Sequence, residues 1–279
     1  MTSAPVVPRP AATVLLLRDH PDAPPGRAPL QVFLQRRVAG MAFAGGMTVF
    51  PGGAVDAADV PDPQLWAGPA PDWWAARLQC PTALAGALVQ AAVRETFEEC
   101  GVLLAAAPHP GADLDAQLLG AARADIVARR RSLGELLRGA GLRLRADLLR
   151  PWARWITPES EPRRYDTAFF VALVPDGQAA DAHTSEAVEA TWWYPDEALA
   201  CADRGEIRLM TPTEHTLREI AALPDSAAVL AAADDRTVRA VAPRVVQRDG
   251  RRVVLLPGDP AYLDPADPAA GDIVPEAPS

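Results

Sequence analysis

The segment Arg94-Glu95-Thr96-Phe97-Glu98-Glu99-Cys100-Gly101-Val102 organises the interpretation of this sequence. At about 100° per residue, its three glutamates fall on one face of a helix. Gly101 is the residue type that commonly follows the last turn of a helix. We therefore predict a helix over Thr82–Cys100, with Thr82 as its N-cap, that carries an acidic ridge near its C-terminal end. The opposite side of this helix is apolar and is expected to be buried (Val89, Val93, Phe97 and Cys100).

The acidic ridge has two possible explanations, a metal site or a solvated acidic face. Carboxylates three and four residues apart repel one another by roughly a few tenths of a kcal/mol per pair. Hard oxygen ligands crowded on a rigid face suit a divalent cation such as Mg²⁺ or Mn²⁺. The combination of one Arg, three Glu and one Gly at fixed spacing arises by chance in on the order of one chain in several thousand. The pattern therefore favours the metal site.

The composition excludes some classes of function. The chain has 279 residues, enough for one large domain or two small ones, and its net charge is −9. Such a charge argues against nucleic-acid binding, which needs a basic face. It also repels a phosphorylated substrate at long range, so a phosphate-binding site would have to supply positive charge locally.

The cysteine spacing and the lengths of the apolar runs indicate where in the cell the protein is expected. Cys80, Cys100 and Cys201 form an odd set without paired spacing, which predicts neither a disulfide framework nor a zinc site. A reducing cytoplasm is expected. No apolar run approaches the roughly 18 residues that span a bilayer, so no membrane association is expected. The proline-rich ends, 1–10 and 266–279, are predicted to be disordered tails.

The remaining periodicity predicts alternating strands and helices. A long-looped hairpin of Ala12–Arg18 and Leu30–Arg36 leads into a glycine-punctuated segment, Gly45–Gly53, around a short β piece. Further strands are predicted at Ala153–Thr157, Tyr165–Val174 and Val188–Tyr194, and further helices at Pro195–Asp203 and Thr211–Leu223. A terminal hairpin is predicted over Val245–Leu256, with Asp249-Gly250 as its turn.

Two stretches have the character of insertions. Residues 57–81 are irregular, with a short helix expected near Trp73. The three tryptophans of this stretch either pack it onto the body or form a substrate wall, and we favour packing (Trp66, Trp73 and Trp74). Residues 112–141 have helical periodicity broken at Gly134 and Gly139. The cations Arg129-Arg130-Arg131 in this stretch either form a solvated helix face, which we favour, or lie near the acidic site.

The acidic ridge and the glycines before it resemble the Nudix box of the Nudix hydrolases, G-x5-E-x7-R-E-U-x-E-E-x-G-U, where U is a bulky apolar residue. The second half matches from Arg94 to Val102, with Thr96 at a position that is usually apolar. The first half matches at Gly53, but Asp59 stands where the pattern has glutamate. Asp59 and Arg94 are 94 − 59 = 35 positions apart, 27 more than in the pattern.

A box split by an insertion is similar to the Nudix group that contains coenzyme A and acyl-coenzyme A diphosphatases. The shared segments are Val49-Phe50-Pro51-Gly52-Gly53, Ala92 to Glu99, Trp155-Ile156-Thr157-Pro158, and Arg163-Arg164-Tyr165-Asp166-Thr167-Ala168-Phe169-Phe170. The resemblance covers about residues 11–265, which are expected to form a single Nudix domain. It implies an α/β/α sandwich with a mixed β-sheet, and extra helices from the insertions.

The resemblance also implies a reaction and a set of site residues. The reaction is metal-dependent hydrolysis of a nucleoside diphosphate derivative. Mg²⁺ or Mn²⁺ would be held by Glu95, Glu98 and Glu99 together with the backbone carbonyl of Gly52, and Arg94 would orient the carboxylates. Either Glu98 or Glu95 would accept a proton from the attacking water.

Three further residues are candidates for substrate binding. Glu186 either joins the site or is a surface acid at the start of a strand. Arg163 and Arg164 either hold substrate phosphates or are surface residues, with Arg164 pairing with Asp166 or another acid.

Three functions remain open from the sequence. The leading hypothesis is hydrolysis of the diphosphate of coenzyme A or acyl-coenzyme A. The alternatives are a pyrophosphatase for NADH or ADP-ribose, and a Nudix-like binding or regulatory module without turnover. A homodimer is the default expectation for the assembly.

Overall fold

Two long apolar strands, β1 (Arg9–Asp19) and β9 (Tyr165–Leu173), form the centre of a mixed sheet. The computed structural model describes residues 6–41, 43–106, 116–184, 187–234, 236–248, 251–259 and 261–262. β1 and β9 run parallel over nine residue pairs, with Thr13 opposite Phe169. Successive side chains of a strand point to opposite faces. Val14 and Leu16 therefore join one apolar core, while Leu15 and Leu17 join another on the far side of the sheet.

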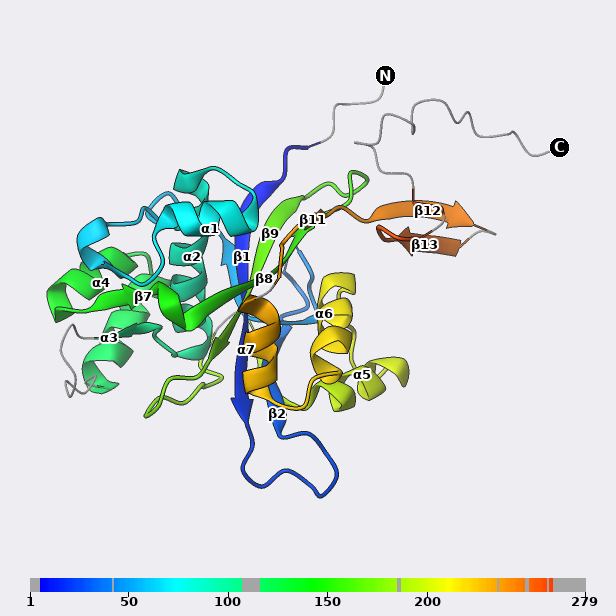
Figure 1. The fold of residues 1–279 in the computed structure, drawn as a ribbon, viewed down its shortest axis with the longest axis horizontal. Helices are drawn as coiled ribbons and strands as arrows, with labels where there is room; N and C mark the ends of the chain where they lie inside the picture. The colour runs from blue at the N-terminus through cyan, green and yellow to red at the C-terminus, as the bar shows by residue number, and fades with distance from the viewer. Residues whose placement is uncertain are drawn as a thin grey trace.

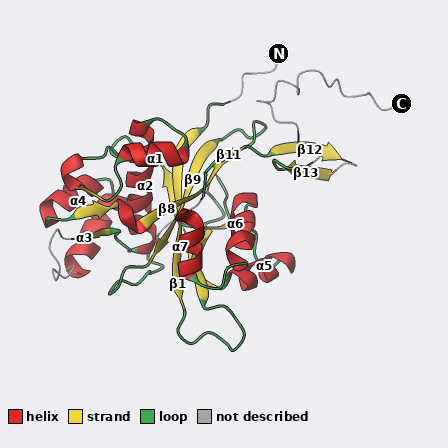
Figure 2. Cartoon of the chain, in the orientation of Figure 1, coloured by secondary structure: helices red, strands yellow, loops and turns green. Residues whose placement is uncertain are grey.

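The sheet has helices on both faces, as Figures 1 and 2 show. The strand order is β10-β2-β1-β9-β8-β11, with β3 paired to β2 and β4 paired to β1. The other strands are β2 (Leu30–Arg37), β3 (Thr48–Val49), β4 (Gly52–Ala54), β8 (Leu149–Ile156), β10 (Ala187–Trp193) and β11 (Ala240–Val241). The predicted α/β/α sandwich with a mixed sheet is confirmed.

The two faces carry different helices. One core contains side chains of α1 (Pro71–Leu78), α2 (Thr82–Cys100), α3 (Ala116–Val127) and α4 (Leu133–Ala140). The other contains side chains of α5 (Pro195–Asp203), α6 (Thr211–Ala221) and α7 (Ser226–Asp234). Helix α7 was not predicted. Also unpredicted is a small sheet in the order β5 (Trp66–Ala67), β7 (Arg143–Arg145) and β6 (Ala105–Ala106), flanked by short 3₁₀ turns at Pro63–Leu65 and Ala146–Leu148.

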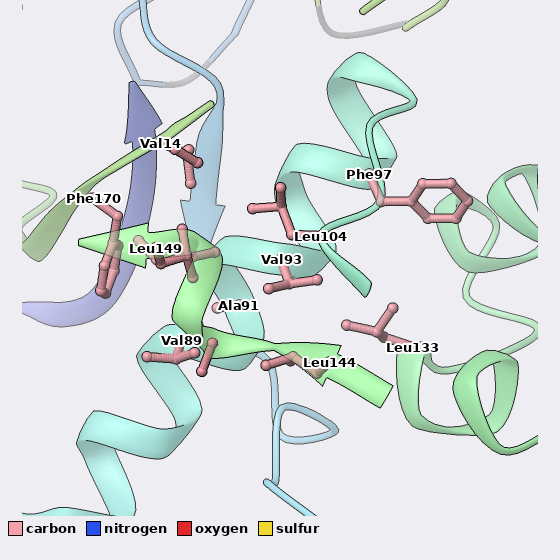
Figure 3. Close-up of a cluster of buried hydrophobic side chains, with 14 of the residues drawn as sticks. Val14, Val89, Ala91, Val93, Phe97, Leu104, Leu133, Leu144, Leu149 and Phe170 are labelled. Atoms are coloured by element: carbon pink, nitrogen blue, oxygen red, sulfur yellow. The ribbon is translucent and has the colours of Figure 1, made fainter. Parts of the chain in front are cut away.

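Helix α2 has the predicted bounds and packs its apolar side into the first core (Figure 3). Gly101 ends it with φ +73° and donates its N–H to the carbonyl oxygen of Phe97 over 3.0 Å. The predicted N-cap was wrong. Pro81 occupies that position without a side-chain cap, and the hydroxyl of Thr82 donates instead to Asp72 Oδ1 over 2.7 Å.

The helical insertion contains two helices, but the predicted break was wrong. Gly134 and Gly139 lie inside α4, and the break between α3 and α4 lies before Leu133. The reason is a capping box in which Ser132 and Glu135 satisfy each other's backbone N–H groups, so a new helix starts there. In the first insertion, Trp74 is fully buried and its ring centre lies 5.7 Å from that of Phe170, which supports the packing interpretation for this tryptophan.

The ends of the chain differ in part from the prediction. Arg9 and Pro10 were assigned to a disordered tail, but they belong to β1, and the N–H of Arg9 donates to the carbonyl oxygen of Arg164 over 2.9 Å. The C-terminal hairpin is present as β12 (Arg244–Arg248) and β13 (Arg251–Leu255). Its predicted turn, Asp249-Gly250, and the predicted tail 266–279 lie outside the described residues. In the part of the chain that the structure describes, no helix is long and apolar enough to cross a membrane.

Candidate active site

The acidic end of α2 and strand β1 both lie close to β4, and each contact requires a glycine. Gly52 has φ +151°, and a Cβ on it would lie 2.3 Å from the carbonyl oxygen of Ala12 in β1. A Cβ on Gly53 would lie 2.4 Å from Glu95 Oε1. Distances this short exclude any side chain at either position unless the neighbours move. Gly52 therefore allows β4 to approach β1, and Gly53 allows it to approach the acidic ridge.

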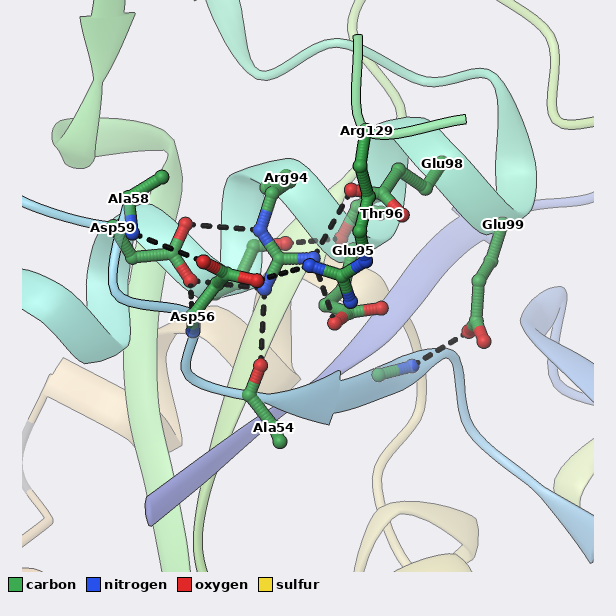
Figure 4. A network of polar contacts seen from close by, with 12 residues as sticks. Ala54, Asp56, Ala58, Asp59, Arg94, Glu95, Thr96, Glu98, Glu99 and Arg129 are labelled. Atoms are coloured by element: carbon green, nitrogen blue, oxygen red, sulfur yellow. Dashed lines mark hydrogen bonds and ion pairs between the residues drawn. The ribbon is translucent and has the colours of Figure 1, made fainter. Parts of the chain in front are cut away.

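Arg94 is the centre of the polar network (Figure 4). Its Nε and Nη2 each donate to one oxygen of the Asp59 carboxylate, both over 2.9 Å. Its Nη1 donates to Glu95 Oε1 over 2.8 Å and to Glu98 Oε1 over 3.0 Å. Its Nη2 also donates to the carbonyl oxygen of Ala54 over 3.0 Å. A guanidinium has five N–H groups, and these five acceptors use all of them.

Arg94 keeps its positive charge although it is buried. Burial opposes the charged form, but the hydrogen bonds to Asp59 and the charge of Glu95 outweigh it and raise the pKa of Arg94 above its ordinary value. Arg94 thus joins β4, the loop at Asp59 and the acidic ridge through one permanently charged group. The predicted arrangement, in which Arg94 orients the carboxylates, agrees with these bonds.

Asp59 reaches Arg94 in spite of the residues inserted between them. Its side chain is only 2% exposed and makes the two-pronged ion pair with Arg94. The insertion leaves after Asp59 and returns along α1 to the start of α2, so the pair closes across it. The side chain of Asp59 is thus long enough to hold Arg94 against the loop that follows β4.

Glu99 is held differently from the other two ridge glutamates. It is buried, and its Oε2 accepts from the amide Nε2 of Gln35 over 2.5 Å and from the N–H of Gly52 over 2.7 Å. Sequence reasoning missed Gln35. The available signal was a neutral polar residue next to the apolar run Val32–Leu34 of β2, because buried polar groups need partners. Gly52 contacts the ridge through its N–H, while the predicted role of its carbonyl remains a prediction.

Thr96 stands where the resemblance places an apolar residue, and the structure explains why it is tolerated. It is fully buried, and its hydroxyl donates to the carbonyl oxygen of Ala92, one turn earlier, over 2.7 Å. This bond satisfies the hydroxyl within the helix.

A second ion pair lies beside the first. The backbone N–H of Asp56 donates to Asp59 Oδ2 over 2.8 Å, and the Asp56 carboxylate pairs with Arg129, which follows α3. The N–H of Ala58 and then the Arg129 guanidinium hold the pKa of Asp56 below its ordinary value. Arg129 therefore lies near the acidic site, against the favoured prediction. Arg130 pairs with Asp125 of α3 and Arg131 donates to the carbonyl oxygen of Glu135, so these two arginines lie in the connection between α3 and α4 and not on a helix face.

The C-terminal end of α2 is braced from outside by Arg123 of α3. Its Nε donates to the carbonyl oxygen of Glu98 over 3.0 Å, and its Nη1 contacts both oxygens of Asp181 over 2.8 Å. The N–H of Asp181 donates to the carbonyl oxygen of Cys100 over 2.9 Å. The helical insertion therefore supports the end of α2 that carries the ridge.

The predicted substrate residues have mixed outcomes. Arg164 is buried and donates to the carbonyl oxygens of Thr157 and Val6, over 3.0 and 2.8 Å, so it fixes the N-terminal segment and is not presented to a ligand. Its alternative pairing with Asp166 is wrong, because Asp166 pairs with Arg154 over 2.6 Å. Arg163 is exposed, and its role stays a prediction. Glu186 lies outside the described residues.

The ridge suits a divalent cation in chemistry and charge. Asp59, Glu95, Glu98 and Glu99 carry four negative charges and Arg94 one positive charge, so these five side chains sum to −3. Carboxylates in such numbers are stabilised by a cation bound through oxygen. Among the described residues, no three His, Cys, Asp or Glu side chains converge on a common centre. The ridge carboxylates instead contact Arg94, Gln35 and the N–H of Gly52, so the oxygen donors that a divalent cation would need are present and are held by protein partners.

Comparison with known proteins agrees with this geometry. Residues 75–220 match the family model for the NUDT19 Nudix domain. The human acyl-coenzyme A diphosphatase NUDT19 is 31% identical over 258 residues, 76% of this chain and 68% of that protein. The putative nudix hydrolase 7 of Caenorhabditis elegans is 31% identical over 201 residues, and the match covers 70% of this chain and 57% of that protein.

A solved structure has the same fold. The crystal structure of a NUDIX hydrolase from Alicyclobacillus acidocaldarius superposes with a TM-score of 0.64 at 26% identity, covering 81% of this chain and 96% of that one. The structural agreement therefore extends over most of the chain.

Proposed function

The chain belongs to the Nudix hydrolases, in the family of the NUDT19 Nudix domain, and on this premise we propose that it hydrolyses the diphosphate of coenzyme A or acyl-coenzyme A with the help of Mg²⁺ or Mn²⁺. Cleavage would give a phosphopantetheine or its acyl derivative and adenosine 3′,5′-bisphosphate. The human relative that is named for the acyl-coenzyme A reaction supports this choice over NADH or ADP-ribose.

One observation carries the proposal. Arg94 is buried, and its Nη1 donates hydrogen bonds to both Glu95 and Glu98. Its Nη2 donates to Ala54 and Asp59, which holds the ridge against the Gly52–Gly53 turn. Buried charges that serve only stability are easily replaced by apolar residues. A cluster of like charges maintained around one arginine is better explained by a ligand that needs them.

The side chains have distinct roles in this proposal. Glu95, Glu98 and Glu99, with the Gly52 carbonyl, would hold the cation, which when bound lowers the pKa of water and stabilises charge on phosphate oxygens. Arg94 keeps the ridge oriented. Glu98 and Glu95 are both candidates to accept the proton of the attacking water, and each is partly exposed, with 20% and 13% of its side chain accessible. Arg163 and Glu186 are proposed to contact the substrate.

Hydrolysis of a panel of diphosphates tests the proposal. Coenzyme A, acetyl-coenzyme A, NADH and ADP-ribose are incubated with Mg²⁺ or Mn²⁺, and the products are separated by chromatography. We expect the two coenzyme A compounds to be cleaved fastest, and no cleavage in EDTA. A protein that turns over none of the four at saturating metal would contradict the proposal.

Matched variants separate the two candidate bases. Glu98→Gln and Glu95→Gln each remove a charge and keep the shape, and loss of a general base lowers kcat by about 100-fold to 10,000-fold. The variant with the larger loss of kcat at saturating metal identifies the proton acceptor. Thermal unfolding of both variants serves as the folding control.

A further inference from the structure

Arg129 has a backbone conformation that favours glycine. It lies two residues after the end of α3 with φ +55°, and its N–H donates to the carbonyl oxygen of Ile126 over 2.8 Å. The next N–H, of Arg130, reaches back to the carbonyl oxygen of Asp125 over 2.8 Å. This is the usual helix ending with a left-handed residue. At the same place α2 has Gly101 and α4 has Gly141, both with positive φ.

An arginine at such a position is disfavoured by its own backbone, so its side chain requires a reason. That side chain is 77% exposed and extends to the Asp56 carboxylate. Asp56 is bonded through its N–H to Asp59, which holds Arg94. Figure 4 draws the Arg129 guanidinium beside this network. The left-handed residue therefore places a solvent-accessible cation at the edge of the acidic ridge.

The site needs such a cation if its substrate carries phosphates. The ridge is strongly negative, and all five N–H groups of Arg94 are already used. Arg123 is mostly buried and pairs with Asp181, and Arg130 pairs with Asp125. Arg129 is the cation of the helical insertion that combines high exposure with a contact to the site network.

We propose that Arg129 binds a phosphate group of the substrate, and that Asp56 is its resting partner. The inference rests on the proposed function for the position of the substrate. The planar guanidinium matches phosphate oxygens in a two-pronged contact. Exposed Arg–Asp pairs contribute little to stability, so exchange of Asp56 for phosphate costs little. The helical insertion would thereby supply the positive charge that the acidic chain otherwise lacks.

Arg129→Gly is the decisive variant because glycine suits the backbone and removes only the side chain. Arg130→Ala is the matched control, one residue away and paired with Asp125 of α3 instead of Asp56. Binding of coenzyme A in EDTA, measured by calorimetry, reports the phosphate contact without turnover. We expect Kd to rise about 10-fold in Arg129→Gly, the effect of one charged hydrogen-bonding group, and to stay within about twofold in Arg130→Ala.

A second variant predicts the opposite sign. Asp56→Asn keeps the oxygen that accepts from Ala58 but removes the competing charge, so Kd for coenzyme A should fall. If the parent does not bind coenzyme A in EDTA, or if Arg129→Gly binds as tightly as the parent, the inference is overturned. The proposed function would fail with a different result, in which coenzyme A binds in EDTA but is not hydrolysed after Mg²⁺ is added back.

The same titration identifies which phosphate is bound. Dephospho-coenzyme A lacks the 3′-phosphate but keeps the diphosphate. If the loss caused by Arg129→Gly disappears with this compound, Arg129 contacts the 3′-phosphate. If the loss is equal with both compounds, Arg129 contacts the diphosphate.

Discussion

Two aspartates of the loop that follows β4 each pair with an arginine from another part of the chain, and the two pairs differ mainly in burial. In the Arg94–Asp59 pair the side chains are 8% and 2% exposed, whereas in the Arg129–Asp56 pair they are 77% and 28% exposed. The two aspartates are linked by one hydrogen bond, from Asp56 N–H to Asp59 Oδ2. The same type of ion pair thus occurs once in the protein interior and once at its surface.

The difference in burial assigns different roles to the two pairs. Removing one partner of a buried pair leaves an uncompensated charge, which is strongly destabilising. An exposed pair is screened by water and can exchange its partner at little cost. The buried pair is therefore suited to hold the ridge in place, and the exposed pair is suited to release its arginine to a ligand.

The largest expected effect is on the buried pair. Asp59→Asn should lower the free energy of unfolding by about 3–5 kcal/mol, because it leaves the Arg94 charge buried without its main partner. Urea denaturation followed by circular dichroism measures the loss. Asp56→Asn is the matched control in the same loop and should cost no more than about 1 kcal/mol. Equal losses in the two variants would remove the basis of the comparison.

The next prediction concerns Gln35, a neutral donor on the buried side of the ridge. Gln35→Leu removes the amide that fixes Glu99, and loss of such a supporting hydrogen bond typically costs about 10-fold to 100-fold in metal affinity. Titration with Mn²⁺, followed by electron paramagnetic resonance of the free ion, measures this affinity.

Gln31 provides the control for Gln35. It is also a buried glutamine of β2, but its amide oxygen accepts from Arg18 Nε over 2.8 Å, away from the ridge. Gln31→Leu should leave Mn²⁺ affinity unchanged. If both leucine variants weaken Mn²⁺ binding equally, Gln35 acts through the packing of the strand and not through Glu99.

The smallest effect is expected on the exposed pair. Arg129→Gly should leave the free energy of unfolding unchanged or raise it by about 1 kcal/mol, because glycine relieves the left-handed backbone while an exposed ion pair is lost. The reverse change at the end of α4, Gly141→Arg, should lower it by about the same amount. Thermal melts of the two variants give both values, and a clear destabilisation by Arg129→Gly would show that the pair has a structural role.

Local patterns in the sequence determined much of this molecule. The bounds of α2, its glycine ending and the spacing of Glu95, Glu98 and Glu99 follow from helical periodicity, which depends only on neighbours in the chain. The continuous apolar runs in β1 and β9 likewise predicted buried strands, and their side chains enter the cores on both faces of the sheet. The acidic ridge could therefore be predicted from residues that lie close together in the sequence, whereas the fold class was predicted from the resemblance of these and other segments to the Nudix hydrolases.

Contacts across long separations were decided only by the tertiary structure. Asp59 meets Arg94 across 35 positions, Gln35 meets Glu99 across 64, and Arg129 meets Asp56 across 73. Whether an insertion brings its ends together, and which way a polar side chain of a buried strand turns, depends on packing between distant elements. Arg164 makes the same point, because an arginine of a motif that suggested phosphate binding is buried against backbone carbonyls. Burial distinguishes Arg94 and Arg164, which are held by protein partners, from the exposed Arg129, for which we propose a ligand, and burial is a property of the folded chain.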